Sequence, residues 1–315
     1  MRKILLIITT SLAFTTAFTQ ADDVCVCCNQ FYPRFGHDYE EVFEPEYISG
    51  KKIRTVTINI ISKSFKVLGK DTTYTLLHDS YPMMSYNFNR EGYVTETKRF
   101  GEYGKYFEIT RFTRNGNNQL LSVEDYYIDD NTGKEVSVGG THHDYTWQNG
   151  YLIKEKNRDY DNKTILPDDK SYYTNYSYDT TGRLVKIYQY WYFDEKNIQK
   201  IVSTIQYSKD KRSSVEKSVV DGKPSTIKKT AYDEYETPLT EKLFDARGKL
   251  LQEKNFEYDN EGRITKYRVK SPGMGTECPD GGNITNNFYY KADGSYSKVF
   301  HYYKNILCEM TVEYK

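Results

Sequence analysis

The sequence predicts an all-β fold: an antiparallel, repeat-built meander sheet of hairpins that is curled or partly shell-like. Turn-forming glycines recur mostly every 12 to 17 residues, and the segments between them are rich in Tyr, Thr, Ile and Val. After four residues for a turn, strands of roughly 8 to 12 residues remain, too short for a strand plus a crossover helix. Successive strands are therefore expected to be antiparallel, and there should be about 16 of them.

The N-terminus has the pattern of a secretory signal peptide over residues 1–21. Arg2 and Lys3 precede an apolar stretch that runs to Phe18, and Thr19 and Ala21 supply the small residues that a signal peptidase requires. A transmembrane anchor is disfavoured, because the stretch is shorter than the roughly 20 residues that span a bilayer. The chain is therefore expected to be secreted across the inner membrane and to be periplasmic or extracellular, without a transmembrane segment once the signal is cleaved.

Residues 22–49 form an acidic arm that carries cysteines. The arm holds three of the five cysteines, and an acidic run with one histidine follows them: Cys25, Cys27, Cys28; His37, Asp38, Glu40, Glu41, Glu44, Glu46. The run lacks the alternating oxygen ligands and the glycine of a calcium loop, so it is not expected to bind a metal ion. The cysteine spacing fits no familiar zinc site, and disulfides are expected in an oxidising compartment, including a possible intermolecular bond.

Residues 50–315 form the expected repeat domain. Its recurring phrase is a pair of aromatic or β-branched residues two apart, followed within a few residues by glycine. Such pairs share one face of a strand, and the glycine permits a tight turn. The copies are Tyr86/Phe88, Thr110/Phe112, Tyr145/Trp147, Tyr176/Tyr178, Phe256/Tyr258 and Phe288/Tyr290, with degenerate copies at Ile205/Tyr207 and Tyr232. About eight repeats, near 29 residues each, therefore provide two strands apiece.

Two copies share the sequence motif "YD..GR[LI].K", which begins at Tyr178 and at Tyr258. They resemble the YD, or RHS (rearrangement hot spot), repeats of exported bacterial β-proteins. In the large relatives, long arrays of these repeats coil into a β-shell around a toxic domain. The present chain has only about eight repeats and nothing like the motif that closes such shells. The resemblance therefore implies a short, stand-alone member without a toxin domain.

Charge and composition narrow the function classes. Removing Arg2 and Lys3 leaves 42 basic against 44 acidic side chains, and this balance argues against a nucleic-acid partner. Aromatic residues make up 16% of the chain, so it is expected to fold rather than to be disordered. No cofactor-binding motif and no catalytic motif are present, so a non-enzymatic protein without cofactors is expected.

The remaining candidate residues are few. His142, His143 and Asp144 form the one compact group of metal-ligand types, but strand neighbours point to opposite faces, so a solvated loop end is the preferred interpretation. Paired carboxylates for glycoside chemistry stay open, since no pair stands out. A disulfide between Cys278 and Cys308 is predicted, because the loop around Cys278 and the start of the last strand lie at the same end of a meander, about 10 Å apart.

The leading functional hypothesis is an exported, non-enzymatic binding or interaction protein that contacts a protein or a surface glycan through its Tyr-rich faces and turns. One alternative is a partner of a secreted toxin, either as an immunity protein or as a reduced shell. Another is a carbohydrate-binding or carbohydrate-active protein in which exposed rings such as Trp191 stack on sugars. A neighbouring toxin gene would favour the first alternative, and a groove with two carboxylates beneath exposed rings would favour the second.

Overall fold

The structure is a computed structural model that describes residues 43, 45–68, 71–101, 105–129, 132–137, 143–157, 166–272, 284–303 and 306–315. One short helix, one 3₁₀ turn and nineteen strands are described. They are α1 (Pro45–Gly50), β1 (Thr55–Leu68), β2 (Asp71–Phe88), β3 (Val94–Phe100), β4 (Tyr106–Arg114), β5 (Leu120–Ile128), β6 (Glu135–Ser137), β7 (His143–Gln148), β8 (Tyr151–Asn157), η2 (Asp168–Lys170), β9 (Tyr173–Tyr178), β10 (Leu184–Asp194), β11 (Asn197–Tyr207), β12 (Ser213–Val220), β13 (Lys223–Tyr232), β14 (Pro238–Asp245), β15 (Leu250–Tyr258), β16 (Ile264–Lys270), β17 (Ile284–Tyr290), β18 (Tyr296–Tyr303) and β19 (Ile306–Tyr314).

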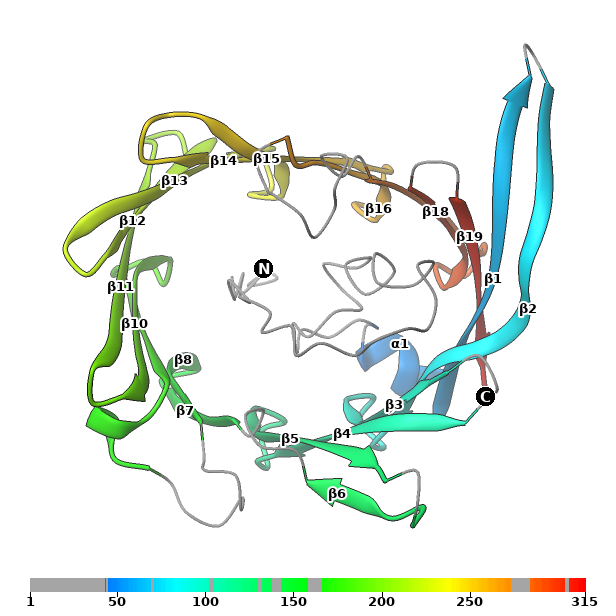
Figure 1. Cartoon of the computed structure of the whole chain (residues 1–315), viewed down its shortest axis with the longest axis horizontal. Coiled ribbons are helices and arrows are strands. Elements are labelled where there is room, and N and C mark those ends of the chain that lie inside the picture. Colours follow the sequence, from blue (N-terminus) through cyan, green and yellow to red (C-terminus); the bar gives the residue numbers. More distant parts are fainter. Residues whose placement is uncertain are drawn as a thin grey trace.

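The strands form one antiparallel sheet that closes on itself as a barrel (Figure 1). Each strand pairs with the next along the chain, except that β6 is a side branch of β5, which also pairs with β7. The last strand pairs with the first over nine residue pairs, from Val56 opposite Tyr314 to Ser64 opposite Ile306. The backbone of Lys315 extends this seam, because it exchanges hydrogen bonds with Thr55. Eighteen strands therefore make up the ring.

The predicted all-β antiparallel meander is confirmed, and the closed barrel is a more specific shape than the curled sheet that was predicted. The eight repeats form the hairpins β2–β3, β4–β5, β7–β8, β9–β10, β11–β12, β13–β14, β15–β16 and β17–β18. These supply the 16 expected strands. β1 and β19 lie outside the repeats, and their pairing closes the ring.

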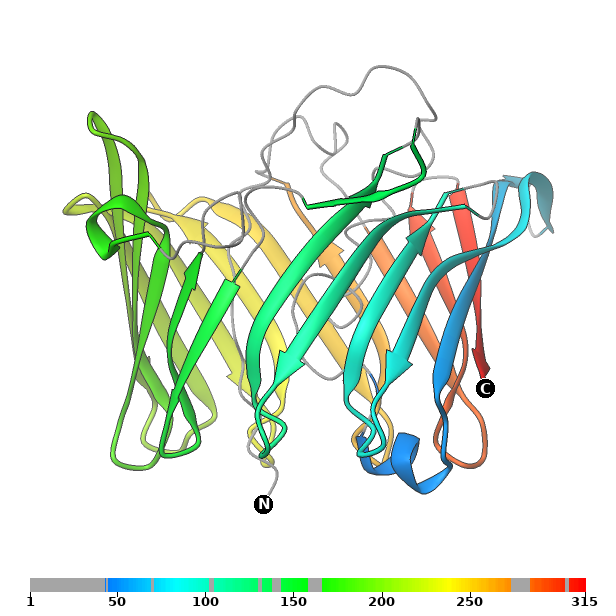
Figure 2. The same ribbon diagram turned by 90° about the horizontal axis from the view of Figure 1, so that it is seen from below.

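All eight repeat turns lie at one edge of the barrel, named here the turn rim; the opposite edge is the loop rim (Figure 2). In the best-preserved copy, Asp179 accepts hydrogen bonds from the backbone N–H groups of Thr181 (2.8 Å) and Arg183 (3.0 Å). Its second oxygen accepts a bond from Arg183 Nε at 2.9 Å. Gly182 has φ +82°, which a residue with a side chain rarely adopts. The Asp, Gly and Arg of the motif therefore build one turn.

The tyrosine and arginine of the motif connect successive repeats. The hydroxyl of Tyr178 donates to the carbonyl of Leu152, at the start of the preceding repeat's second strand, and Tyr258 donates likewise to Pro238, both at 2.8 Å. The guanidinium of Arg183 lies 4.6 Å from the ring centre of Tyr207 in the following repeat. The residues of the "YD..GR" motif are therefore explained by contacts within one turn and between neighbouring repeats.

The barrel has an apolar inner face on one side. α1 lies within the outline of the ring in Figure 1 and at the turn rim in Figure 2, and Phe43, just before it, packs its ring 5.3 Å from that of Tyr86 and 6.2 Å from that of Tyr296. Alternate residues of β1 face the same way and are buried, namely Val56, Ile58 and Ile60. These residues belong to a core cluster that continues through β16 to β19 and into β2 and β3.

The segment before β1 approaches the first repeat turn closely. A Cβ atom at Gly92 would lie 2.1 Å from the carbonyl oxygen of Pro45, and Gly92 has φ +91°. Only glycine fits this position, so the turn of the first repeat is shaped to receive the start of α1. Among the residues described, no helix is long and apolar enough to cross a membrane.

Candidate functional site

A row of polar and aromatic side chains on the inner face runs from β7 and β8 through Tyr172, just before β9, to β10. His143 of β7 lies opposite Asn157 of β8, the backbone N–H of Asn157 donates to the carbonyl of Tyr172, and the ring of Tyr172 contacts that of Trp191 on β10, 5.4 Å between centres. These four residues are named here the inner row. They lie toward the loop rim, because β8 ends and β9 begins there.

Glu155 lies next to the inner row and is almost completely buried, with 3% of its surface exposed. One carboxylate oxygen is 2.7 Å from Nδ1 of His143, and the other accepts a hydrogen bond of 3.1 Å from the hydroxyl of Tyr176. Burial and, next, the charge of Glu155 raise the pKa of Tyr176 well above its usual value, so the hydroxyl stays protonated and donates. The carboxylate of Glu155 therefore lies in contact with both the imidazole of His143 and the hydroxyl of Tyr176.

Asn157 Oδ1, Ser171 Oγ and Trp191 Nε1 are buried polar atoms, in and beside the inner row, that find no hydrogen-bond partner within the described part of the chain. Tyr172 is better satisfied, since its hydroxyl accepts bonds from Thr174 (3.2 Å) and Gln189 (3.5 Å). A buried polar group without a partner costs about 1–3 kcal/mol, so these three atoms are candidates for contact with another polar group.

The structure places His143 and Asp144, two of the three residues singled out in the sequence, on opposite faces of β7. His143 faces Glu155, whereas its neighbour Asp144 pairs across the strands with Lys156, on the opposite face. The two side chains therefore lie on opposite faces of the sheet, as alternation along a strand requires. The interpretation as a solvated loop end is wrong for His143, whose side chain is only 15% exposed because it lies on the inner face. His142 lies outside the described residues.

Trp191 was expected to be exposed, and the structure corrects that expectation. The side chain is half-buried and lies against Tyr172 and Phe193. The indole can still take part in binding, but from the inner side of the ring rather than from its outer surface.

Other carboxylates of the inner face pair with bases on neighbouring strands. Glu108 of β4 is 3.0 Å from Arg99 of β3, and Glu216 of β12 is 2.6 Å from Lys228 of β13. Within the described ranges, no group of three or more His, Cys, Asp or Glu side chains could hold a metal ion. These carboxylates therefore stabilise the ring by pairing rather than by forming an open acidic site.

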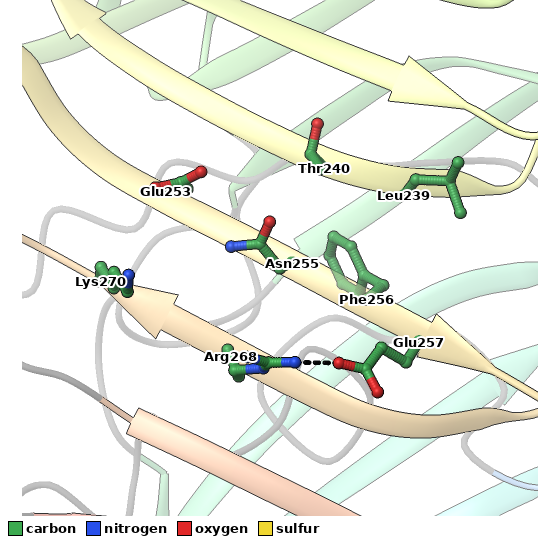
Figure 3. A pocket seen from close by; sticks show the side chains of 8 residues that line it. All are labelled: Leu239, Thr240, Glu253, Asn255, Phe256, Glu257, Arg268 and Lys270. Atoms are coloured by element: carbon green, nitrogen blue, oxygen red, sulfur yellow. Dashed lines mark hydrogen bonds and ion pairs between the residues drawn. The ribbon is translucent and has the colours of Figure 1, made fainter.

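A shallow depression of about 440 Å³ lies on β14, β15 and β16 (Figure 3). It is lined by Leu239, Thr240, Glu253, Asn255, Phe256, Glu257, Arg268 and Lys270. Both glutamates are ion-paired, Glu253 with Lys242 at 3.2 Å and Glu257 with Arg268. The ring of Phe256 packs against Tyr267 of the core cluster. The depression therefore lacks the exposed rings above two carboxylates that would favour glycoside chemistry.

Large apolar side chains are exposed mainly at the loop rim. Of the twelve that the structure describes as exposed, eight lie on strand segments near that rim and four near the turn rim. The loop-rim group is Tyr74, Leu76, Leu77, Phe107, Tyr127, Val136, Phe193 and Ile198. The turn-rim group is Leu121, Tyr235, Leu239 and Tyr289.

Cys308 lies near the start of β19, the last strand, and its side chain is fully buried. Its sulfur lies 3.6 Å from the hydroxyl oxygen of Ser62 on β1, across the closing seam. Cys278 lies outside the described residues, so the Cys278–Cys308 disulfide stays a prediction. The same holds for Cys25, Cys27 and Cys28 and for the acidic run, of which the structure describes Glu46 alone.

No family model and no curated protein matches this chain. Among solved structures, a porin-like protein from Bacteroides uniformis ATCC 8492 is 11% identical with a TM-score of 0.34, covering 82% of this chain and 97% of that one. A putative outer membrane lipoprotein-sorting protein domain from Vibrio parahaemolyticus is 9% identical with a TM-score of 0.20, covering 86% and 91%. Likenesses this weak support no conclusion about function.

Proposed function

We propose that this chain is an exported, non-enzymatic binding protein built from YD-like repeats, and that it contacts its partner through the loop rim. The observation that carries the proposal is the concentration of exposed apolar side chains at that rim. Aromatic residues are enriched in the buried centres of protein interfaces, and exposed apolar clusters often mark contact sites. The turn rim, by contrast, is occupied by the hydrogen-bonded turns that hold neighbouring repeats together.

The outer face of the barrel carries charged side chains, as expected of a surface in contact with water. Charged pairs follow this face around the ring, including Lys298–Glu309 at 2.9 Å and Lys242–Glu253 at 3.2 Å. On a barrel that spans a bilayer, a basic residue at the lipid midplane costs about 2–4 kcal/mol. The mature chain is therefore proposed to work in the periplasm or outside the cell, with its walls in water.

The rim proposal is tested with two matched triple variants. The loop-rim variant carries Phe107→Ser, Tyr127→Ser and Phe193→Ser; the control carries Leu121→Ser, Tyr235→Ser and Tyr289→Ser at the turn rim. Both remove three exposed apolar side chains. Each is immobilised beside the unaltered chain and exposed to envelope extract of the source cells, and the retained proteins are quantified. Loss of a specific partner from the loop-rim variant alone supports the proposal, whereas retention by that variant and loss from the control refutes it.

A carbohydrate-binding role is a second candidate, and the inner row favours it. Asn157 Oδ1 accepts hydrogen bonds, Trp191 Nε1 donates them, and aromatic rings lie beside both, which suits a ligand rich in hydroxyl groups. Trp191 is one of only two tryptophans, so its fluorescence reports binding. Glycans released from the source cells should shift the emission of the unaltered chain but not of Trp191→Phe, and an unchanged spectrum at saturating glycan would exclude this role.

A further inference from the structure

The hairpin of β1 and β2 is longer than any other in the ring, with strands of 14 and 18 residues. Figure 1 shows it extending well beyond the barrel wall. On one side, β19 pairs with β1 only as far as Ser64; on the other, β3 pairs with β2 only from Met84 onward. Within the described residues, β2 therefore has β1 as its neighbour from Asp71 to Pro82 but has no strand along its other edge.

Open strand edges are normally protected, because their backbone N–H and C=O groups can pair with another chain. The part of this edge near the barrel has such protection. Pro82 supplies no backbone donor, Asp79 adds a charge, and three register shifts between Ile58 and Lys63 of β1 make the pairing irregular. This part of β2 is therefore a poor template for another strand.

The outer part of the edge, Thr72–Leu77, has none of these protective features. Its sequence, TTYTLL, contains no charge, proline or glycine, and it consists mostly of residues with high β propensity. It pairs with β1 without a register shift from Leu76 opposite Lys63 to Thr72 opposite Val67. The side chain of Leu76 is 53% exposed. A short, uncharged segment of this kind at an exposed edge favours strand addition.

We propose that this edge is the contact surface for a second copy of the chain, which adds its own Thr72–Leu77 segment as an antiparallel strand. Only another strand can satisfy a row of alternating backbone donors and acceptors, and a two-fold axis lets identical edges satisfy each other. Pairing centred on Thr75 sets Thr75 opposite Thr75 of the second copy and Thr73 opposite Leu77. The Thr75 pair is a favourable cross-strand pair, and no like charges meet within the segment.

The contact is short, so the dimer should be weak and should depend on concentration. Sedimentation velocity of the mature chain, from low micromolar to several hundred micromolar, should show a growing dimer fraction. Leu76→Lys adds a charge to the edge and should raise the dimer dissociation constant by about 10-fold or more. Leu239→Lys is the matched control, because Leu239 is 38% exposed but lies on β14, which has strands on both sides. It should dimerise like the unaltered chain.

Hydrogen exchange locates the contact and separates it from other surfaces. The backbone amides of Thr72–Leu77 that exchange fast in dilute protein should be protected at high concentration, and this protection should be absent in Leu76→Lys. A chain that stays monomeric at several hundred micromolar overturns the proposal. The proposal is also overturned if the Leu76→Lys variant dimerises as strongly as the unaltered chain and unfolds at the same denaturant midpoint. The test needs no other protein, so its failure leaves the loop-rim proposal standing.

Discussion

Replacing Asp179 tests whether the repeat turns are held by their aspartates. The side chain accepts bonds from the backbone N–H and hydroxyl of Thr181 and from the backbone N–H and Nε of Arg183. Hydrogen bonds to a charged group contribute about 1.5–3 kcal/mol in favourable cases, but this turn is partly exposed to solvent. Asp179→Ala should therefore lower the free energy of unfolding by about 2–3 kcal/mol, measured by urea denaturation at neutral pH.

The conservative variant divides that loss into two parts. Asp179→Asn keeps the acceptor for the backbone N–H groups and removes only the ion pair with Arg183. The two side chains of this ion pair are each about a quarter exposed. The variant should cost about 0.5–1 kcal/mol. The matched control is Asp245→Asn, since Asp245 accepts bonds from the backbone of Arg247 and Lys249 and has no ion pair within the described structure. That variant should be nearly neutral. A loss below about 0.5 kcal/mol for Asp179→Ala would refute the role given to the motif.

Three further outcomes are expected. Gly92→Ala should cost about 2 kcal/mol or more, because it adds a clash with the carbonyl of Pro45 to the strain of a positive φ; Gly222→Ala, at φ +79° in open space, should cost only about 1 kcal/mol in the same urea titration. Glu216→Ala should cost about 3 kcal/mol because it leaves Lys228 buried without its carboxylate, and adding Lys228→Met should restore much of the loss in a double-mutant cycle. Bonds from Ser295 lower the pKa of Asp293 to about 2, so its stabilisation is present above the unfolded pKa near 4 and is lost as the pH falls toward 2; an acid titration of Asp293→Asn should lack that part of the loss.

The turns of the repeats could be predicted from the sequence because their contacts are local. Aspartate, glycine and arginine lie within five residues of one another, so one motif holds the whole turn. The degenerate copy at Tyr232 follows the same plan with a different residue at the strained position. Asp233 accepts bonds from the backbone of Tyr235 and Thr237, and Glu236, at φ +62°, replaces the glycine. A search for the aspartate rather than the glycine would have found this turn.

Closure could not be predicted, because it depends on curvature summed over the whole ring. Each turn fixes only the pairing of its own two strands, whereas the seam joins Asn59 to Thr311, residues that lie 252 positions apart. The same reason accounts for the misjudged exposure of His143. Alternation along a strand places His143 and Asp144 on opposite faces, but only the closed ring decides which face is inner.

The closing seam is the central claim, and a cross-link across it is the most direct test. Asn59 and Thr311 are opposite each other on β1 and β19, so Asn59→Cys combined with Thr311→Cys should form a disulfide within one chain. Asn59→Cys combined with Thr285→Cys is the control, since β17 is separated from β1 by β18 and β19. Non-reducing peptide mapping of monomeric protein should recover the first cross-link and not the second. If the first appears only between two chains, or in no monomer, the sheet is open and the barrel is wrong.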